Sequence, residues 1–220
     1  MTKLQSLDNL QNESTRLFAD ILRNFSNVQS IVVTGCENGV GVTSLCIALA
    51  RSVARLRHAK VLVVDANFRA STLTKTANAN GAKGLRDLVA GGAAFGAERL
   101  DLADFVVPFG SDIMILPVGT KTGIEMVDLD SAGVLGALHE KLTAEYDFIL
   151  WDTDTVNHST DTKVLMANVP DVILVTQSDE TRIDHMVSSL NEIKSLKRRL
   201  VAILRNQAGR TFLGVGADQE

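Results

Sequence analysis

Short apolar runs rich in β-branched residues alternate with helical patterns along this chain, and this alternation constrains the fold more than any other feature. The runs that we expect to be strands lie at 30–34, 60–64, 112–116, 147–151, 171–176 and 200–204. The amphipathic helical patterns between them lie at 45–56, 134–142 and 183–193. Strands that alternate with helices indicate a parallel sheet covered on both faces. We therefore predict an α/β fold, a three-layer, doubly wound and mostly parallel sheet.

The composition is compatible with one globular domain. The chain has 220 residues, of which 45% are hydrophobic, and a formal net charge of −4. This charge argues against a nucleic-acid partner, whose binding surface is normally basic. Cys36 and Cys46 form no disulfide framework, which suits a reducing compartment. The polar N-terminus and the lack of a long apolar run lead us to expect a cytoplasmic protein, which a partner can recruit to the inner face of the cell membrane.

A glycine-rich segment, CENGVG, follows the first expected strand and precedes a helix. A P-loop requires this order, because its backbone N–H groups and the helix N-terminus bind phosphate together. Gly39 and Gly41 would let the backbone approach a phosphate, and Thr43, followed by Ser44, stands where a Mg²⁺-binding hydroxyl belongs. The motif needs a lysine after Gly41, but this chain has Val42, which cannot neutralise phosphate charge. Weak nucleotide binding is compatible with this loop, whereas efficient phosphoryl transfer is not.

Carboxylates stand at the ends of the second and fourth expected strands. Asp65 is followed by Asn67 and Arg69, and Asp152 occupies the Walker-B position. Because the carboxyl ends of parallel strands meet at one edge of a sheet, we expect these residues to lie near the glycine-rich loop. Aspartates there can hold Mg²⁺ or orient a nucleophile, although an aspartate at a strand end can also simply cap the next turn. We interpret Asp65 and Asp152 as vestiges of catalytic carboxylates and, with Thr43, as candidate metal ligands.

An ordered series of motifs resembles the bacterial tyrosine autokinases of capsule and exopolysaccharide assembly over most of the chain. The matching segments are NGVGVT (38–43), VLVVDANFR (61–69), GLRDL (84–88), LPVG (116–119), YDFILWDTD (146–154) and ILRN (203–206). The resemblance implies a P-loop NTPase-like domain over 29–210, preceded by an N-terminal helical extension (1–28) and followed by a short tail (211–220). It also implies the nucleotide-binding positions Gly39, Gly41, Val42, Thr43, Ser44, Asn67, Arg69 and Asn206. The expected cofactors are ATP or ADP with Mg²⁺, bound weakly or not at all.

The chain departs from the autokinase pattern at several informative positions. Besides Val42, Asn67 replaces the second aspartate of the Walker-A′ motif, and Glu37 places a negative charge in the phosphate loop. The oligomerisation signature of the family is half kept, with Ala19 in place of its second arginine. The family carries a tyrosine cluster in its tail, whereas the one tyrosine here is Tyr146. We therefore expect negligible autophosphorylation.

The resemblance and its departures together predict a degenerate, autokinase-like protein that regulates or scaffolds exopolysaccharide biosynthesis and export. The implied partner is the cytoplasmic segment of a membrane chain-length regulator or co-polymerase, and a homo-oligomer is compatible with the family. Two alternatives stay open. One is an active ATPase or protein tyrosine kinase with an unconventional site, in which Arg69 or a partner's lysine supplies the missing charge. The other is a positioning switch of the MinD/ParA type.

Overall fold

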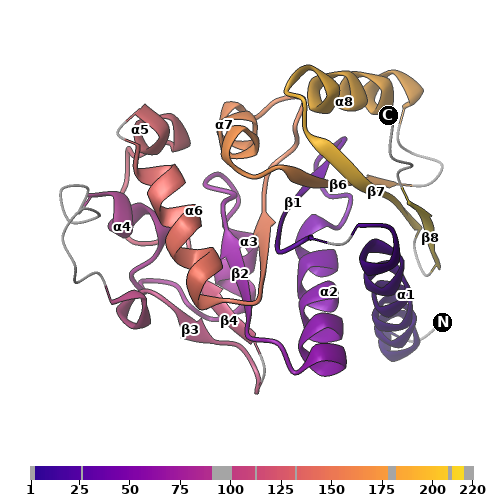
Figure 1. The fold of residues 1–220 in the computed structure, drawn as a ribbon, viewed down its shortest axis with the longest axis horizontal. Coiled ribbons are helices and arrows are strands. Elements are labelled where there is room, and N and C mark those ends of the chain that lie inside the picture. The colour runs from indigo at the N-terminus through magenta and orange to yellow at the C-terminus, as the bar shows by residue number, and fades with distance from the viewer. Residues whose placement is uncertain are drawn as a thin grey trace.

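The computed structural model describes residues 3–25, 27–90, 101–111, 113–131, 133–177, 182–207 and 210–215 (Figure 1). Its strands are β1 (Ser30–Gly35), β2 (Val61–Asp65), β3 (Val107–Pro108), β4 (Ile113–Leu116), β5 (Phe148–Asp152), β6 (Asp171–Gln177), β7 (Arg199–Gln207) and β8 (Arg210–Val215). Its helices are α1 (Lys3–Asn24), α2 (Val42–Arg57), α3 (Thr72–Thr76), α4 (Leu85–Ala90), the 3-10 helix η2 (Leu102–Asp104), α5 (Met126–Ser131), α6 (Val134–Glu145), α7 (Thr160–Asn168) and α8 (Ile183–Ser195).

The strands in the described part of the chain form one eight-stranded sheet in the order β3-β4-β2-β5-β1-β6-β7-β8. The six central strands, β4 to β7 in that order, pair in parallel, and β3 and β8 close the two edges antiparallel. Strands β1, β2 and β5 are buried along their whole length, as their β-branched and aromatic sequences require. The predicted fold class, a three-layer α/β sandwich around a mostly parallel sheet, is confirmed.

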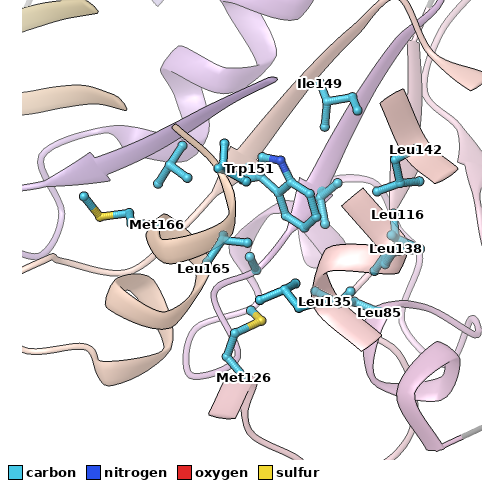
Figure 2. Packing of buried hydrophobic residues seen from close by; sticks show 14 of the residues in the cluster. Leu85, Leu116, Met126, Leu135, Leu138, Leu142, Ile149, Trp151, Leu165 and Met166 are labelled. Carbon is cyan, nitrogen blue, oxygen red and sulfur yellow. The ribbon is translucent and has the colours of Figure 1, made fainter. Parts of the chain in front are cut away.

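Helices cover both faces of the sheet, and each face has its own hydrophobic cluster. On one face α1, α2 and α3 pack on the strands, and on the other face the helices from α4 to α8 do so. Figure 2 shows the second cluster, in which leucines of α4, α6 and α7 surround Trp151 of β5. The indole Nε1 of Trp151 donates to the Ser30 hydroxyl at 2.9 Å, so this buried polar atom is satisfied. The alternation of strand side chains between the two clusters fixes the strand register.

The segments predicted as an N-terminal extension and a tail both pack on the domain between them. Helix α1 is a component of the core, because Leu17, Phe18 and Ile21 are buried against α2 and the ring of Phe18 meets Phe148 edge-on at 5.3 Å. The segment predicted as a tail from residue 211 contains most of β8, which pairs with β7. Strand β8 closes an edge that would otherwise expose unpaired backbone groups. Residues 216–220 lie outside the described part.

A search of the described helices for a membrane-spanning segment finds none that is both long enough and apolar enough.

Candidate functional site

The backbone of the glycine-rich loop takes the left-handed conformation twice, immediately before α2. Gly39 and Gly41 have φ angles of 78° and 96°, which glycine adopts without the strain that a Cβ would cause. A Cβ on Gly41 would also collide with the side-chain amide of Asn206. That amide donates to the Val40 carbonyl at 2.8 Å and ties the loop to β7. Gly41 is the N-cap of α2 without a side-chain cap, so the first N–H groups of the helix are available to an anion.

The loop borders a pocket of about 460 Å³ at the carboxyl edge of the sheet, a volume typical of small-molecule sites. Its lining comes from the loop, the start of α2 and the segments after β2 and β5: Glu37, Asn38, Gly39, Gly41, Val42, Thr43, Ser44, Asn67, Arg69, Ala70, Thr72, Thr153, Asp154 and Thr155. The residues predicted to bind nucleotide therefore converge here, except Asn206, which supports the loop from β7. The sequence motifs did not identify Thr153, Asp154 and Thr155 as lining, although they directly follow the Walker-B position.

Asp65 and Asp152 lie side by side, since they are register partners in the β2–β5 pairing. Both are buried, at 0% and 1% exposure, behind the residues that line the pocket. The two aspartates that the sequence predicted to cluster near the loop are thus neighbours. Their surroundings differ, and the difference separates their chemistry.

The Asp65 carboxylate is engaged by its own strand end and by α3. Its Oδ2 accepts from the Thr74 backbone N–H at 2.8 Å and from the Thr74 hydroxyl at 2.6 Å, and its Oδ1 accepts from the Asn67 N–H at 3.3 Å. Burial raises the pKa of Asp65, and these donors oppose the rise. Thr74 in turn accepts from the Val118 N–H at 3.0 Å. Asp65 therefore holds the start of α3 and the segment after β4 in place.

The Asp152 carboxylate has no such donors. Neither of its oxygens has a hydrogen-bond partner among the described residues. Burial raises the pKa of Asp152 to about 8, and the nearby Asp65 charge adds to the rise. The Thr43 hydroxyl opposes the rise, although it does not complete a hydrogen bond to Asp152. A buried carboxylate with both oxygens unused needs either a proton or a cation.

Thr43 and Asp152 suit the Mg²⁺ that the fold implies. A hydroxyl and a carboxylate are the oxygen ligands that Mg²⁺ takes, and the Asp152 oxygens are not occupied by other described groups. Asp65 is less suited, because hydrogen bonds already reach both of its oxygens. As an electrophile, the ion would neutralise phosphate charge.

Glu37 connects the loop to α8 through contacts that no sequence pattern indicates. Its Oε1 lies 2.8 Å from Nδ1 of His185 and accepts from the backbone N–H of Arg182 at 3.2 Å. The Asn157 side chain donates to the carbonyls of Cys36 and His185 at 3.2 and 3.1 Å. The loop is thus fixed from the α8 side by residues far away in sequence. The Glu37 charge stays at the rim of the pocket.

Asn67 and Arg69 follow β2 toward the pocket mouth. The Asn67 Oδ1 accepts from the Ala70 N–H at 3.0 Å and shapes the turn into α3. Arg69 is exposed, and no hydrogen bond or ion pair joins it to another described residue. Its guanidinium is therefore a cation at the pocket that no described carboxylate neutralises.

A protein-family model described as cellulose biosynthesis protein BcsQ matches residues 28–192, which is most of the chain. A sequence search among curated proteins finds no significant match.

Solved structures with the same fold include kinase domains and a septum site-determining protein. The VpsO kinase domain superposes with a TM-score of 0.78 at 22% identity, over 93% of this chain and 97% of that one. The kinase domain of the Escherichia coli tyrosine kinase ETK gives a TM-score of 0.75 at 19% identity, over 87% and 72%. The septum site-determining protein MinD of Pyrococcus horikoshii, solved with Mg-ADP, gives 0.62 at 20% identity, over 80% and 69%. At these identities the likeness establishes the fold.

Proposed function

The chain belongs to the BcsQ family of cellulose biosynthesis proteins, and on that premise we propose that it regulates or scaffolds exopolysaccharide production and export without being an efficient phosphotransferase. Cellulose is the polymer that the family name points to. The autokinase resemblance supports a partner that is the cytoplasmic segment of a membrane chain-length regulator or co-polymerase. The observation that carries the proposal is the charge of the glycine-rich-loop pocket.

The side chains that line that pocket neutralise little of the negative charge of a polyphosphate. Among the described lining residues, Arg69 is the only cation, whereas Glu37 and Asp154 are carboxylates. Val42 stands at the lysine position, lines the pocket and also packs against the core on the α1–α2 face. The backbone cradle of a P-loop is present, but the side-chain charge that follows the transferring phosphoryl group is not. We infer that this site is degenerate: it retains weak nucleotide binding and has lost efficient catalysis.

The tyrosine of this sequence is also unsuited as a phosphorylation target. Tyr146 is 3% exposed, and its ring lies beneath the Lys60 ammonium, 4.6 Å from Nζ. Burial raises the pKa of Tyr146 to about 12, so the phenolate form of the nucleophile is scarce at neutral pH. A kinase reaction of this chain on itself would need local unfolding at the start of β5.

One observation favours an active enzyme as the second candidate function. Arg69 lines the pocket, and no hydrogen bond or ion pair joins its guanidinium to another described residue, so it is available to contact a phosphate. An arginine supplied in this way can stabilise transferring phosphate charge. Loss of Mg-ATP hydrolysis in Arg69→Ala, from a measurable wild-type rate, would establish this alternative.

Titration of the wild type and of Val42→Lys with Mg-ATP tests the proposal. The pocket is open and its glycines and Thr43 are in place, so a lysine there should find the phosphates. Mg-ATP affinity should rise by about ten- to a hundredfold, the worth of one charge-assisted contact of ~1.5–3 kcal/mol. Hydrolysis should stay low, because Asn67 still replaces a metal-side carboxylate. Val42→Met is the matched control, because it adds length without charge and should leave the affinity near that of the wild type.

Two results would contradict the proposal. Rapid hydrolysis or tyrosine phosphorylation by the purified wild type, abolished in Asp152→Ala, would show an efficient enzyme. No gain in affinity in a folded Val42→Lys protein would show that the pocket does not admit nucleotide, and the degenerate nucleotide site would have to be abandoned.

A further inference from the structure

A second pocket, of about 490 Å³, lies at the other end of α2. Helix α2 has 16 residues and is therefore roughly 24 Å long, so this pocket is remote from the glycine-rich loop. Its walls come from α1, from the last two turns of α2 and from the connection between β3 and β4. The residues that matter here are Gln11, Arg51, Arg55, His58, Phe109 and Ile113. We call it the arginine pocket.

The arginine pocket has basic and neutral walls. Among the described residues that line it, none carries a carboxylate. Arg51 and Arg55 are one helical turn apart on α2, so their side chains project from the same face. Arg55 has no hydrogen bond or ion pair with any described residue. Pairing with the helix dipole accounts for cations in the last turn, but Arg51 lies before that turn and is oriented by something else.

Phe109 orients Arg51. The Arg51 guanidinium lies over the Phe109 ring, 5.6 Å from its centroid. A cation–π contact of this kind leaves N–H groups of the guanidinium available for hydrogen bonds to a ligand. Ala54 and Ile113, both buried, contribute an apolar part of the lining, which we call the floor. The pocket thus combines two guanidiniums, one of them oriented by the Phe109 ring, with an apolar surface for the uncharged part of a ligand.

We propose that the arginine pocket binds a small ligand that carries a phosphate ester. Two guanidiniums on one helix face can bind the oxygens of a single tetrahedral phosphate together. They match this group better than the separate carboxylates of an extended acidic peptide. The aromatic ring and the floor then hold the organic part. This assignment is independent of the proposed function, because it uses none of the residues of the glycine-rich-loop pocket.

Titration of the full chain with inorganic phosphate and with glycerol phosphate at constant ionic strength tests the proposal. Glycerol phosphate should bind more tightly than inorganic phosphate, because it also contacts the floor. Arg51→Ala and Arg55→Ala should each lower the affinity about tenfold or more. Arg57→Ala is the matched control: it removes the same charge from the same helix end, but Arg57 does not line the pocket, and its affinity should stay within about twofold of the wild type.

Sedimentation with vesicles of equimolar phosphatidylglycerol and phosphatidylcholine separates the two sources of a phosphate ester. If the chain binds vesicles, Arg55→Ala abolishes this binding and glycerol phosphate binds weakly, the ligand is a lipid headgroup. If the chain binds glycerol phosphate but not vesicles, the ligand is a soluble metabolite. Equal losses in Arg55→Ala and Arg57→Ala would overturn the proposal, since they indicate diffuse charge attraction. So would phosphate binding that Arg55→Ala does not change, absence of saturable binding to both probes, or tighter Arg55-dependent binding of polyglutamate. Thermal unfolding of each variant confirms that it is folded.

Discussion

The ends of β2 and β5 carry the same residue at the same level of the sheet, yet they form two different sites. At the end of β2, Asp65 accepts three hydrogen bonds and serves the backbone of α3. At the end of β5, Asp152 is equally buried and has no hydrogen-bond partner among the described residues. Desolvation raises the pKa of both carboxylates; three hydrogen bonds oppose the rise at Asp65, whereas at Asp152 the Thr43 hydroxyl alone opposes it. Position at a strand end therefore does not decide whether the oxygens of an aspartate are used within the fold or left available to a ligand; the donors around it do.

Asp152→Asn should sharpen this contrast most, through the pH dependence of stability. In the folded chain the pKa of Asp152 is about 8, against 3.8 for an ordinary aspartate. Between these values the folded state holds a proton that the unfolded state releases, so the free energy of unfolding falls as pH rises from about 4 to about 8. The neutral asparagine removes this loss.

We expect Asp152→Asn to unfold several degrees above the wild type at pH 9 and within about a degree of it at pH 4. Thermal unfolding followed by circular dichroism across this range measures it. At pH 9, Mg²⁺ should stabilise the wild type and not Asp152→Asn. A constant difference between the two proteins at all pH values would mean that Asp152 is compensated like Asp65.

Thr74→Val should break the contrast from the other side, by making Asp65 resemble Asp152. The substitution keeps the shape of the side chain and removes the hydroxyl that donates to Asp65 at 2.6 Å and accepts from the Val118 N–H at 3.0 Å. A buried charged acceptor loses a donor, which costs about 2–3 kcal/mol. Urea unfolding at pH 7 measures this loss, and Thr74→Ser, which keeps the hydroxyl, is the control and should cost clearly less. A loss in Thr74→Val no larger than that in Thr74→Ser would show that the hydroxyl contributes no more to stability than the methyl group.

The glycine-rich loop could be predicted because its residues are contiguous in the sequence. The contacts around the two aspartates could not, because they join residues that are separated along the chain. The glycine-rich loop is encoded within a dozen consecutive residues, so the positions of Gly39, Gly41 and Thr43 at the phosphate loop could be predicted from the sequence alone. The sheet also follows from local patterns, because buried parallel strands are short runs of β-branched residues. The Asp65–Thr74 hydrogen bonds join residues nine positions apart, across a turn, without any periodic signal.

Other features depend on contacts that no local pattern specifies. Glu37 and His185 are 148 positions apart, and nothing in the sequence near either predicts their pairing. Strand β8 comes after the last strand that the sequence predicts, and its TFLGV segment becomes a strand because β7 offers an unpaired edge. The sequence predicts α1 as a helical extension, but its burial against α2 depends on where the sheet presents an open face.

Glu37→Gln should give the smallest effect, and it extends the comparison to a third carboxylate. Glu37 has a partner, as Asp65 has, but the Glu37 and His185 side chains are partly exposed, at 26% and 39%. Partly exposed pairs of this kind contribute about 0.2–1 kcal/mol. The free energy of unfolding should therefore fall by less than about 1 kcal/mol. Mg-ATP affinity should rise about two- to fivefold as one negative charge leaves the pocket. Calorimetric titration measures it, and a lower affinity in Glu37→Gln would show that Glu37 holds the loop in its binding geometry.

Helix α2 runs without interruption from the N-cap Gly41 to His58, and it contributes Thr43 to one pocket and Arg55 to the other. If a ligand in one pocket shifts α2, any resulting change in affinity at the other pocket must be reciprocal: the factor by which one ligand changes the affinity for the second equals the factor by which the second changes the affinity for the first. With both ligands bound and coupled in this way, one helix would integrate two chemical inputs.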